Sequence, residues 1–230
     1  MCGRFLLYHQ KSEIVARFKA AVAPSSQLEF VPRYNIAPTQ NVLTVQEDGE
    51  RYMETMLWGM HLPWMKETNR SLINVRAETL VEKPFFRKML EHNRCILPAS
   101  GFYEWKSDGK KKTPIFFHPA DDGIVGIGGV WSEYESPEGV KVRSCAIITT
   151  EPNELVGEVH NRMPLVLSRE GEDLWLNPST PLATLQTLLV PAPSSLFEAR
   201  EVNDTVNKTN HDSPDCIVQR KSKPESLNLW

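Results

Sequence analysis

The sequence has few cysteines, no long apolar run and no strong excess of charge of one sign, and each absence excludes a class of protein. The four cysteines lie far apart and form no C-x-x-C pair, which argues against a structural zinc site and a disulfide framework. No window approaches the ~18 apolar residues that a membrane-spanning helix needs, and the chain does not open on a basic stretch followed by an apolar run. We therefore expect a soluble cytoplasmic protein with no metal, no cofactor and no membrane partner.

The charge of the chain gives no sign of a general affinity for nucleic acid, since the formal net charge is -3 and the pI is near 6.1. Global charge is a weak test, however, because a basic stripe on one face is enough to bind a phosphate backbone. Basic residues crowd the first half of the chain, whereas acidic residues cluster in 133–138, 151–158 and 170–173. This split permits a basic face without requiring one.

The pattern along the chain predicts many short strands separated by glycine and proline turns. The expected strands cover 3–9, 42–45, 52–58, 95–99, 101–106, 115–118, 124–131 and 142–149. The expected helices cover 13–21, 84–90, 154–159, 170–175 (capped by Ser168) and 180–190, and the prolines at 32 and 38 indicate a loop over 34–39. Residues 1–220 are thus predicted to form one α+β domain on a curled, mostly antiparallel, barrel-like sheet with peripheral helices, followed by a loose tail over 221–230.

The start of the chain is its most informative feature. A small residue at position two normally allows removal of Met1, which would leave Cys2 as the N-terminus. An N-terminal cysteine carries an α-amine with a pKa near ~7.7–8 and a thiol with a pKa near ~8.5, so both are partly nucleophilic at neutral pH. The alternative is that this is an ordinary frayed terminus.

Three further segments put polar side chains where they are candidates for chemistry. Asn74 and Arg76 share one face of a predicted strand, which is either a site or a solvated polar face. Glu104 lies between aromatic residues, and a carboxylate against aromatic rings tends to have a raised pKa, which suits a general acid or base. The alternative is an exposed strand glutamate. His160 follows a predicted helix, where it is either a functional residue or a partner of the helix C-terminus with no further role.

Tryptophans and the remaining cysteines give weaker signals. Cys95 and Cys145 lie in apolar runs and are predicted to be inert core thiols. Trp64 and Trp105 are either core residues or platforms on which unpaired bases stack beside a basic groove.

Six ordered motifs together resemble the SRAP family, the SOS-response-associated peptidase-like proteins that crosslink to abasic sites in single-stranded DNA. The motifs are Cys2–Phe5, Arg33–Pro38, Trp58–Gly59, Asn74–Thr79, Gly101–Trp105 and His160–Pro164. The similarity extends to about Ile217, where Val206–Asn207 and Pro214–Cys216 resemble a C-terminal block of the family.

The resemblance implies a role for each matching residue. It implies that Cys2 is the covalent nucleophile and that Asn74, Glu104 and His160 surround it. The DNA-contact residues that it implies are Arg4, Arg33, Arg76 and Arg162 at phosphates and Pro38, Trp64 and Trp105 against bases. We accordingly expect a monomer whose partner is single-stranded DNA with abasic sites, bound to the nucleoid when it acts, with lyase and self-processing peptidase activity beside the crosslink.

Two other classes of function remain open on the sequence alone. Glutamine amidotransferases of the N-terminal-nucleophile group also begin Met-Cys-Gly, and in them the thiol attacks an amide while the α-amine acts as base. A variant of this class is a peptidase that only processes its own N-terminus. The other class is a noncatalytic single-strand binder, in which Cys2 would have no chemical role.

Overall fold

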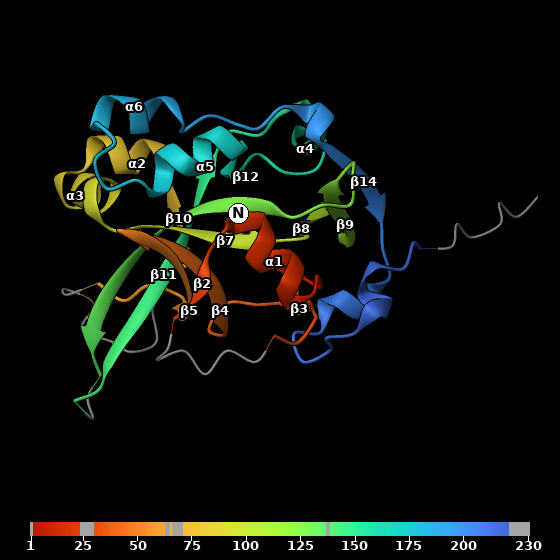
Figure 1. Cartoon of the computed structure of the whole chain (residues 1–230). Helices are drawn as coiled ribbons and strands as arrows, with labels where there is room; N and C mark the ends of the chain where they lie inside the picture. Colours follow the sequence, from red (N-terminus) through yellow and green to blue (C-terminus); the bar gives the residue numbers. More distant parts are fainter. Residues whose placement is uncertain (1, 24–29, 63–64, 66–70, 137–138, 221–230) are drawn as a thin grey trace, which may run out of the picture.

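The computed structural model describes residues 2–23, 30–62, 65, 71–136 and 139–220, and the strands within these ranges form two sheets (Figure 1). Both sheets are mostly antiparallel, and helices lie outside them. The α+β fold expected from the sequence is thus confirmed. None of the helices within these ranges is long and apolar enough to cross a membrane.

Strands of the larger sheet close into a barrel. Its ring consists of β4 (Asn41–Asp48), β5 (Glu50–Trp58), β7 (Arg94–Ala99), β10 (Val125–Glu135) and β11 (Lys141–Thr150). Antiparallel pairs run in the order β11, β10, β7, β4, β5, and a parallel pairing of Leu57 with Ser144 and Trp58 with Cys145 joins β5 back to β11. Shorter strands attach to this ring, namely β2 (Ala21–Val22), β6 (Asn74–Arg76), β12 (Met163–Pro164) and β13 (Val166–Leu167).

The second sheet holds the N-terminal strand. Its order is β14 (Phe197–Glu201), β9 (Lys111–Pro119), β8 (Gly101–Asp108), β1 (Phe5–Leu7) and β3 (Arg33–Ile36). Because β1 lies between β8 and β3, both of its edges are hydrogen bonded. The chain is therefore fixed in a sheet from Phe5 on, and because Cys2 just before it is fully buried, the alternative of a frayed terminus at Cys2 is wrong.

The helices pack around the sheets. They are α1 (Lys11–Phe18), α2 (Ala77–Glu82), α3 (Pro84–His92), α4 (Glu154–Gly157), α5 (Arg169–Leu176) and α6 (Leu182–Thr187). Three 3-10 turns follow, η1 (Ser194–Leu196), η2 (Asp204–Asn207) and η3 (Pro214–Ile217). The predicted cap is present, since Ser168 Oγ accepts the Gly171 N–H at 3.0 Å. Figure 1 shows α2, α3 and α6 gathered at one end of the molecule.

One predicted loop is a strand. Residues 34–36 belong to β3, which pairs with β1 through Phe5–Ile36 and Leu7–Arg33. The flanking prolines, at 32 and 38, lie just outside the strand, and the extended backbone that a proline imposes on the preceding residue suits an edge strand. Proline at these positions thus marks the ends of a strand.

The predicted core position of Cys95 and Cys145 is confirmed, since both are fully buried in the barrel. Trp58 is also fully buried, and its indole Nε1 donates to the Ile73 carbonyl at 2.9 Å. This bond connects the end of β5 to the segment that leads into β6, so the barrel wall helps to position Asn74.

Candidate active site

Cys2 lies just ahead of β1. Its side chain is fully buried, and its Sγ donates to the Arg4 carbonyl at 3.9 Å. The same carbonyl accepts the Tyr103 N–H at 3.0 Å, which ties the residues before β1 to β8. The Cys2 carbonyl oxygen accepts Nδ2 of Asn74 at 2.9 Å. Cys2 is therefore held by two different strands of the protein.

Burial changes the chemistry of the Cys2 thiol. It raises the pKa of the thiol well above its ordinary range, and the negative charge of Glu104 raises the pKa further. The sequence alone predicted a nearly ordinary thiol, so this expectation is wrong, because the pairing of β1 with two neighbours removes Cys2 from water. The thiol is therefore mainly protonated and needs a base before it can attack.

Glu104 on β8 has the raised pKa that its aromatic neighbours predicted. Its side chain is 3% exposed, and burial raises its pKa from 4.5 to about 7, while the positive charge of the N-terminus lowers it. The alternative of an exposed strand glutamate is wrong. A carboxyl group with this pKa exchanges protons near neutral pH, which is the requirement for a general acid or base.

Asn74 is buried next to Cys2, whereas Arg76 on the same short strand is exposed. The alternative of a solvated polar face is therefore wrong for Asn74. While Nδ2 of Asn74 binds the Cys2 carbonyl, its Oδ1 is buried and accepts no hydrogen bond from the described residues. This amide oxygen is an acceptor available to a donor beside Cys2.

His160 lies in the loop that follows α4 and is half-buried. Its Nδ1 lies 3.1 Å from both the backbone nitrogen and the carbonyl oxygen of Arg162, which fixes the ring. Burial lowers the pKa of His160, so the imidazole is mainly neutral at physiological pH. The ring lines the same pocket as Glu104.

A pocket of about 510 Å³ connects two of these groups, Glu104 and His160, to solvent. The residues that line it are Arg4, Glu104, Trp105, Ser107, Lys112, His160 and Asn207. The structure thus brings together four of the residues that the resemblance implied. Ser107 and Lys112 are not among the predicted site residues, and Asn207 is indicated only by the family resemblance, as part of the Val206–Asn207 block. For Lys112, the available signal is its place among the basic residues of the first half of the chain.

Arg4 connects the pocket to a buried polar network. Its Nη1 donates to Asn35 Oδ1 at 2.6 Å and to the Val206 carbonyl at 2.7 Å. The guanidinium carbon lies 5.6 Å from the centre of the Trp105 ring, and the indole Nε1 donates to Asn207 Oδ1 at 2.7 Å. The segment around η2 therefore forms one wall of the pocket and orients Trp105.

Asn35 holds this wall against β3. The residue is fully buried, and its Nδ2 lies within hydrogen-bond distance of three carbonyls of the C-terminal segment, those of Val206, Lys208 and His211, at 3.2, 3.0 and 2.6 Å. Asp212 completes the connection, because its carboxylate accepts the backbone N–H of Asn35 at 3.0 Å.

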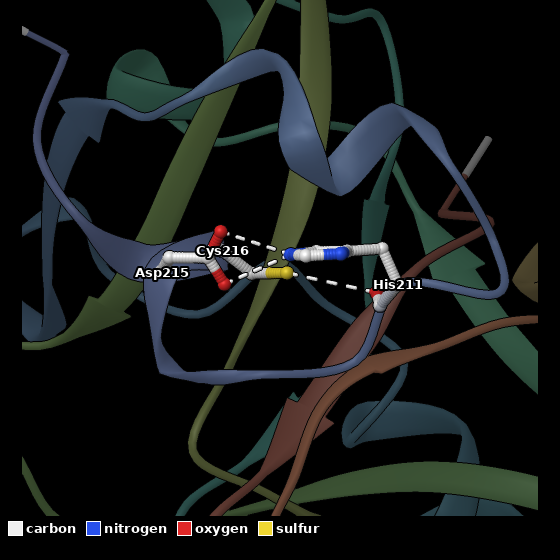
Figure 2. A group of neighbouring side chains, drawn as sticks. All are labelled: His211, Asp215 and Cys216. Carbon is white, nitrogen blue, oxygen red and sulfur yellow. Dashed lines mark hydrogen bonds and ion pairs between the residues drawn. The ribbon is translucent and has the colours of Figure 1, made fainter.

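A side-chain cluster next to this network is the one group of possible metal ligands among the described residues. The ligand atoms of His211, Asp215 and Cys216 lie within 4.8 Å of one another (Figure 2). The group is also bonded internally, since His211 Nε2 is 2.9 Å from both Asp215 oxygens and Cys216 Sγ donates to the His211 carbonyl at 3.7 Å. These contacts close the loop between η2 and η3.

We predict that Asn35→Ala destabilises the fold. The change removes one of the two acceptors of Arg4 Nη1, the Asn35 amide oxygen. It also removes the Asn35 amide nitrogen that donates to three main-chain carbonyls. Each buried group left unpaired costs about 1–3 kcal/mol, so we expect a loss of roughly 2–4 kcal/mol. The measurement is urea unfolding, with Asn210→Ala as the control because Asn210 is exposed on the same segment. Equal unfolding midpoints for the two variants would contradict the prediction.

Four other predicted DNA-contact residues are absent from the lining of this pocket, namely Arg33, Pro38, Arg76 and Arg162. Arg162 is ion paired through both nitrogens with Glu78, at 2.8 and 2.9 Å, and Arg33 is paired with Asp212. Arg76 is exposed next to α2, and the half-buried Pro38 lies in the turn between β3 and β4. Trp64 lies outside the described residues.

Comparison with known proteins gives two relatives whose similarity extends over most of the chain. The abasic site processing protein YoqW of Bacillus subtilis (strain 168) is 41% identical over 223 residues, which cover 94% of this chain and 99% of that protein. The abasic site processing protein YedK of Escherichia coli (strain K12) is 30% identical over 179 residues, covering 76% of this chain and 79% of the relative.

The fold has a solved counterpart. The crystal structure of a protein from Bacteroides thetaiotaomicron superimposes with a TM-score of 0.84 at 24% identity, covering 96% of this chain and all of that one. The sequence profile of the family described as SOS response associated peptidase (SRAP) matches residues 1–209. With this match and the identity to YoqW, the chain belongs to the SRAP family.

Proposed function

We propose that this protein recognises abasic sites in single-stranded DNA and bonds covalently to them through Cys2 once Met1 has been removed. The observation that carries the proposal is the surroundings of Cys2. It is fully buried, its carbonyl accepts a hydrogen bond from Asn74, and its thiol is close enough to Glu104 for that charge to raise the pKa of the thiol. Glu104 in turn lines one pocket together with His160. The relatives named as abasic site processing proteins support the choice of DNA lesion. The product, a thiazolidine, follows from the chemistry of an N-terminal cysteine.

The reaction begins at the α-amine of Cys2. An abasic deoxyribose in its open form presents an aldehyde at C1′, to which the amine adds to give a carbinolamine. Loss of one water gives an imine. The thiol then adds its sulfur to the imine carbon, and its proton goes to the nitrogen, which closes a five-membered ring. Because burial keeps the thiol protonated, attack by the amine precedes attack by the sulfur.

The neighbouring side chains serve the proton transfers. Glu104, with a pKa of about 7, donates a proton to the departing hydroxyl of the carbinolamine and as carboxylate takes the proton from the Cys2 thiol. His160 assists the opening of the sugar ring. The free Oδ1 of Asn74 accepts a hydrogen bond from the amine or the sugar.

The binding surface follows from the pocket. Arg4 is the cation at its back, and Trp105, held by Asn207, offers a ring for stacking of an unpaired base. A single strand is preferred because its bases reach the ring without opening of a duplex. The same imine can lose a proton at C2′ and eliminate the 3′ phosphate, so we also propose a secondary lyase activity. Self-processing at Met1 belongs to the proposal because it frees the amine.

An intact-mass experiment tests the proposal. The purified protein is mixed with a single-stranded oligonucleotide that carries one abasic site, and its mass is measured after denaturation. We expect a covalent adduct one water lighter than the sum of the two partners, with Met1 absent from the protein. Complete lack of adduct in protein whose mass shows that Met1 is removed would contradict the proposal.

A further inference from the structure

The hairpin of β8 and β9 carries lysines on both of its faces, and they differ in their surroundings. Lys112 lies opposite Ser107 in the strand register, and both line the pocket. Lys111 lies opposite Asp108, one position further toward the turn. Because side chains alternate between the faces of a strand, Lys111 projects from the face opposite to that of Lys112.

Lys112 differs from two of the predicted arginines, Arg33 and Arg162, in having no carboxylate partner among the described residues. Arg162 and Arg33 are already paired with carboxylates, those of Glu78 and Asp212. Lys112 is exposed and has no carboxylate within 4.0 Å among the described residues. Its positive charge is therefore available to a ligand at the rim of the pocket.

The chemistry of this rim fits a phosphate. Lys112 offers three N–H donors and Ser107 a hydroxyl donor, side by side on one face of the hairpin. Trp105 lies on the same face, two residues before Ser107, and Arg4 lies behind it. A base stacked on Trp105 would thus bring its backbone toward Lys112.

We infer that Lys112 and Ser107 bind a backbone phosphate next to the abasic nucleotide, so that the DNA strand leaves the pocket over the β8–β9 hairpin. This inference rests on the proposed function and extends it, because it adds a cation outside the set implied by the family resemblance. It also gives the two faces of the hairpin different roles. The face of Lys112 contacts the DNA, whereas Lys111, opposite Asp108, faces away from the DNA.

The test compares Lys112→Ala with Lys111→Ala, which removes the same charge from the other face. Binding of an intact single-stranded oligonucleotide is followed by fluorescence anisotropy over a series of salt concentrations. One phosphate contact to a single strand contributes a slope of about -0.7 in log K against log salt, or about five-fold in affinity at 0.1 M salt. We therefore expect K112A to bind about five-fold more weakly at that salt, with a slope shallower by about 0.7, and K111A to keep the wild-type slope.

Two results would overturn the inference. One is a K112A protein with wild-type affinity and slope, and the other is an equal loss in K112A and K111A, which would indicate a general charge effect. A different result would contradict the proposed function itself, namely a wild-type protein that forms no adduct with abasic DNA. Circular dichroism of both variants shows whether the hairpin has remained folded.

Discussion

Cys2→Ala should leave no adduct with abasic single-stranded DNA that survives denaturation, whereas we expect the wild-type protein to form one. The variant keeps an α-amine after removal of Met1, so it can still form an imine, but it has no sulfur to close the ring. An imine without ring closure hydrolyses back to the aldehyde and the amine. We therefore expect the stable adduct to fall to background in the intact-mass measurement.

Borohydride separates the two steps of this reaction. Reduction during the reaction traps the imine, so Cys2→Ala and Cys2→Ser should both give a reduced adduct although neither gives the stable one at wild-type level. Serine can close an oxygen ring, which is less stable than the sulfur ring. Cys95→Ala is the matched control, because it removes another fully buried thiol away from the site, and it should react as wild type. A stable adduct of wild-type yield in Cys2→Ala would refute the thiazolidine.

Local patterns predicted those parts of the site that depend on neighbours in the sequence. The aromatic residues on both sides of Glu104 indicated its raised pKa, and the structure gives that pKa the same direction. The cap at Ser168 and most strands followed from alternation and from short-range hydrogen bonding. The helix predicted over 180–190 is shorter in the structure, where α6 begins at Leu182 and ends at Thr187.

Long-range pairing determined the parts that the sequence could not predict. The burial of Cys2 results from the position of β1 between β8 and β3, and no property of residues 1–9 indicates it. Arg4 bonds to Asn35, 31 positions further along the chain, and to Val206, 202 positions further along. The parallel pairing of β5 with β11 that closes the barrel is equally invisible to periodicity, because it joins strands far apart in the sequence.

The pocket wall formed by the C-terminal segment also depends on long-range contacts that the sequence does not predict. Asn207 has no local signal of its own, yet its side chain holds Trp105 at the pocket. The resemblance to the SRAP family pointed to Val206–Asn207 as a motif, but the reason for the motif required the fold. The C-terminal segment thus serves the site through the contacts that it makes with β3 and β8.

Glu104→Gln should slow the reaction and stabilise the fold, because the buried carboxylate serves catalysis but costs folding free energy. Loss of a general acid or base slows a reaction by about 10²–10⁴-fold, so we expect the rate of stable adduct formation at pH 7 to fall by at least the lower of these factors. The same substitution should raise the free energy of unfolding at pH 8, since glutamine is neutral and the folded protein then no longer holds a buried charge at this position.

The direction of the effect of Glu104 on stability follows from how its pKa differs between the folded and the unfolded protein. Glu104 has a pKa of about 7 in the folded protein and near 4.5 when unfolded, so the folded state binds the proton more tightly between these values. The stability that Glu104 contributes is present below pH 4.5, is lost as the pH rises toward 7, and stays lost above it. We therefore expect the stability of the variant relative to wild type to increase over this window by on the order of 3 kcal/mol. Urea unfolding at pH 4.5 and pH 8 measures this increase, and an equal difference at both pH values would mean that Glu104 titrates normally and that its role as a neutral-pH acid and base is wrong.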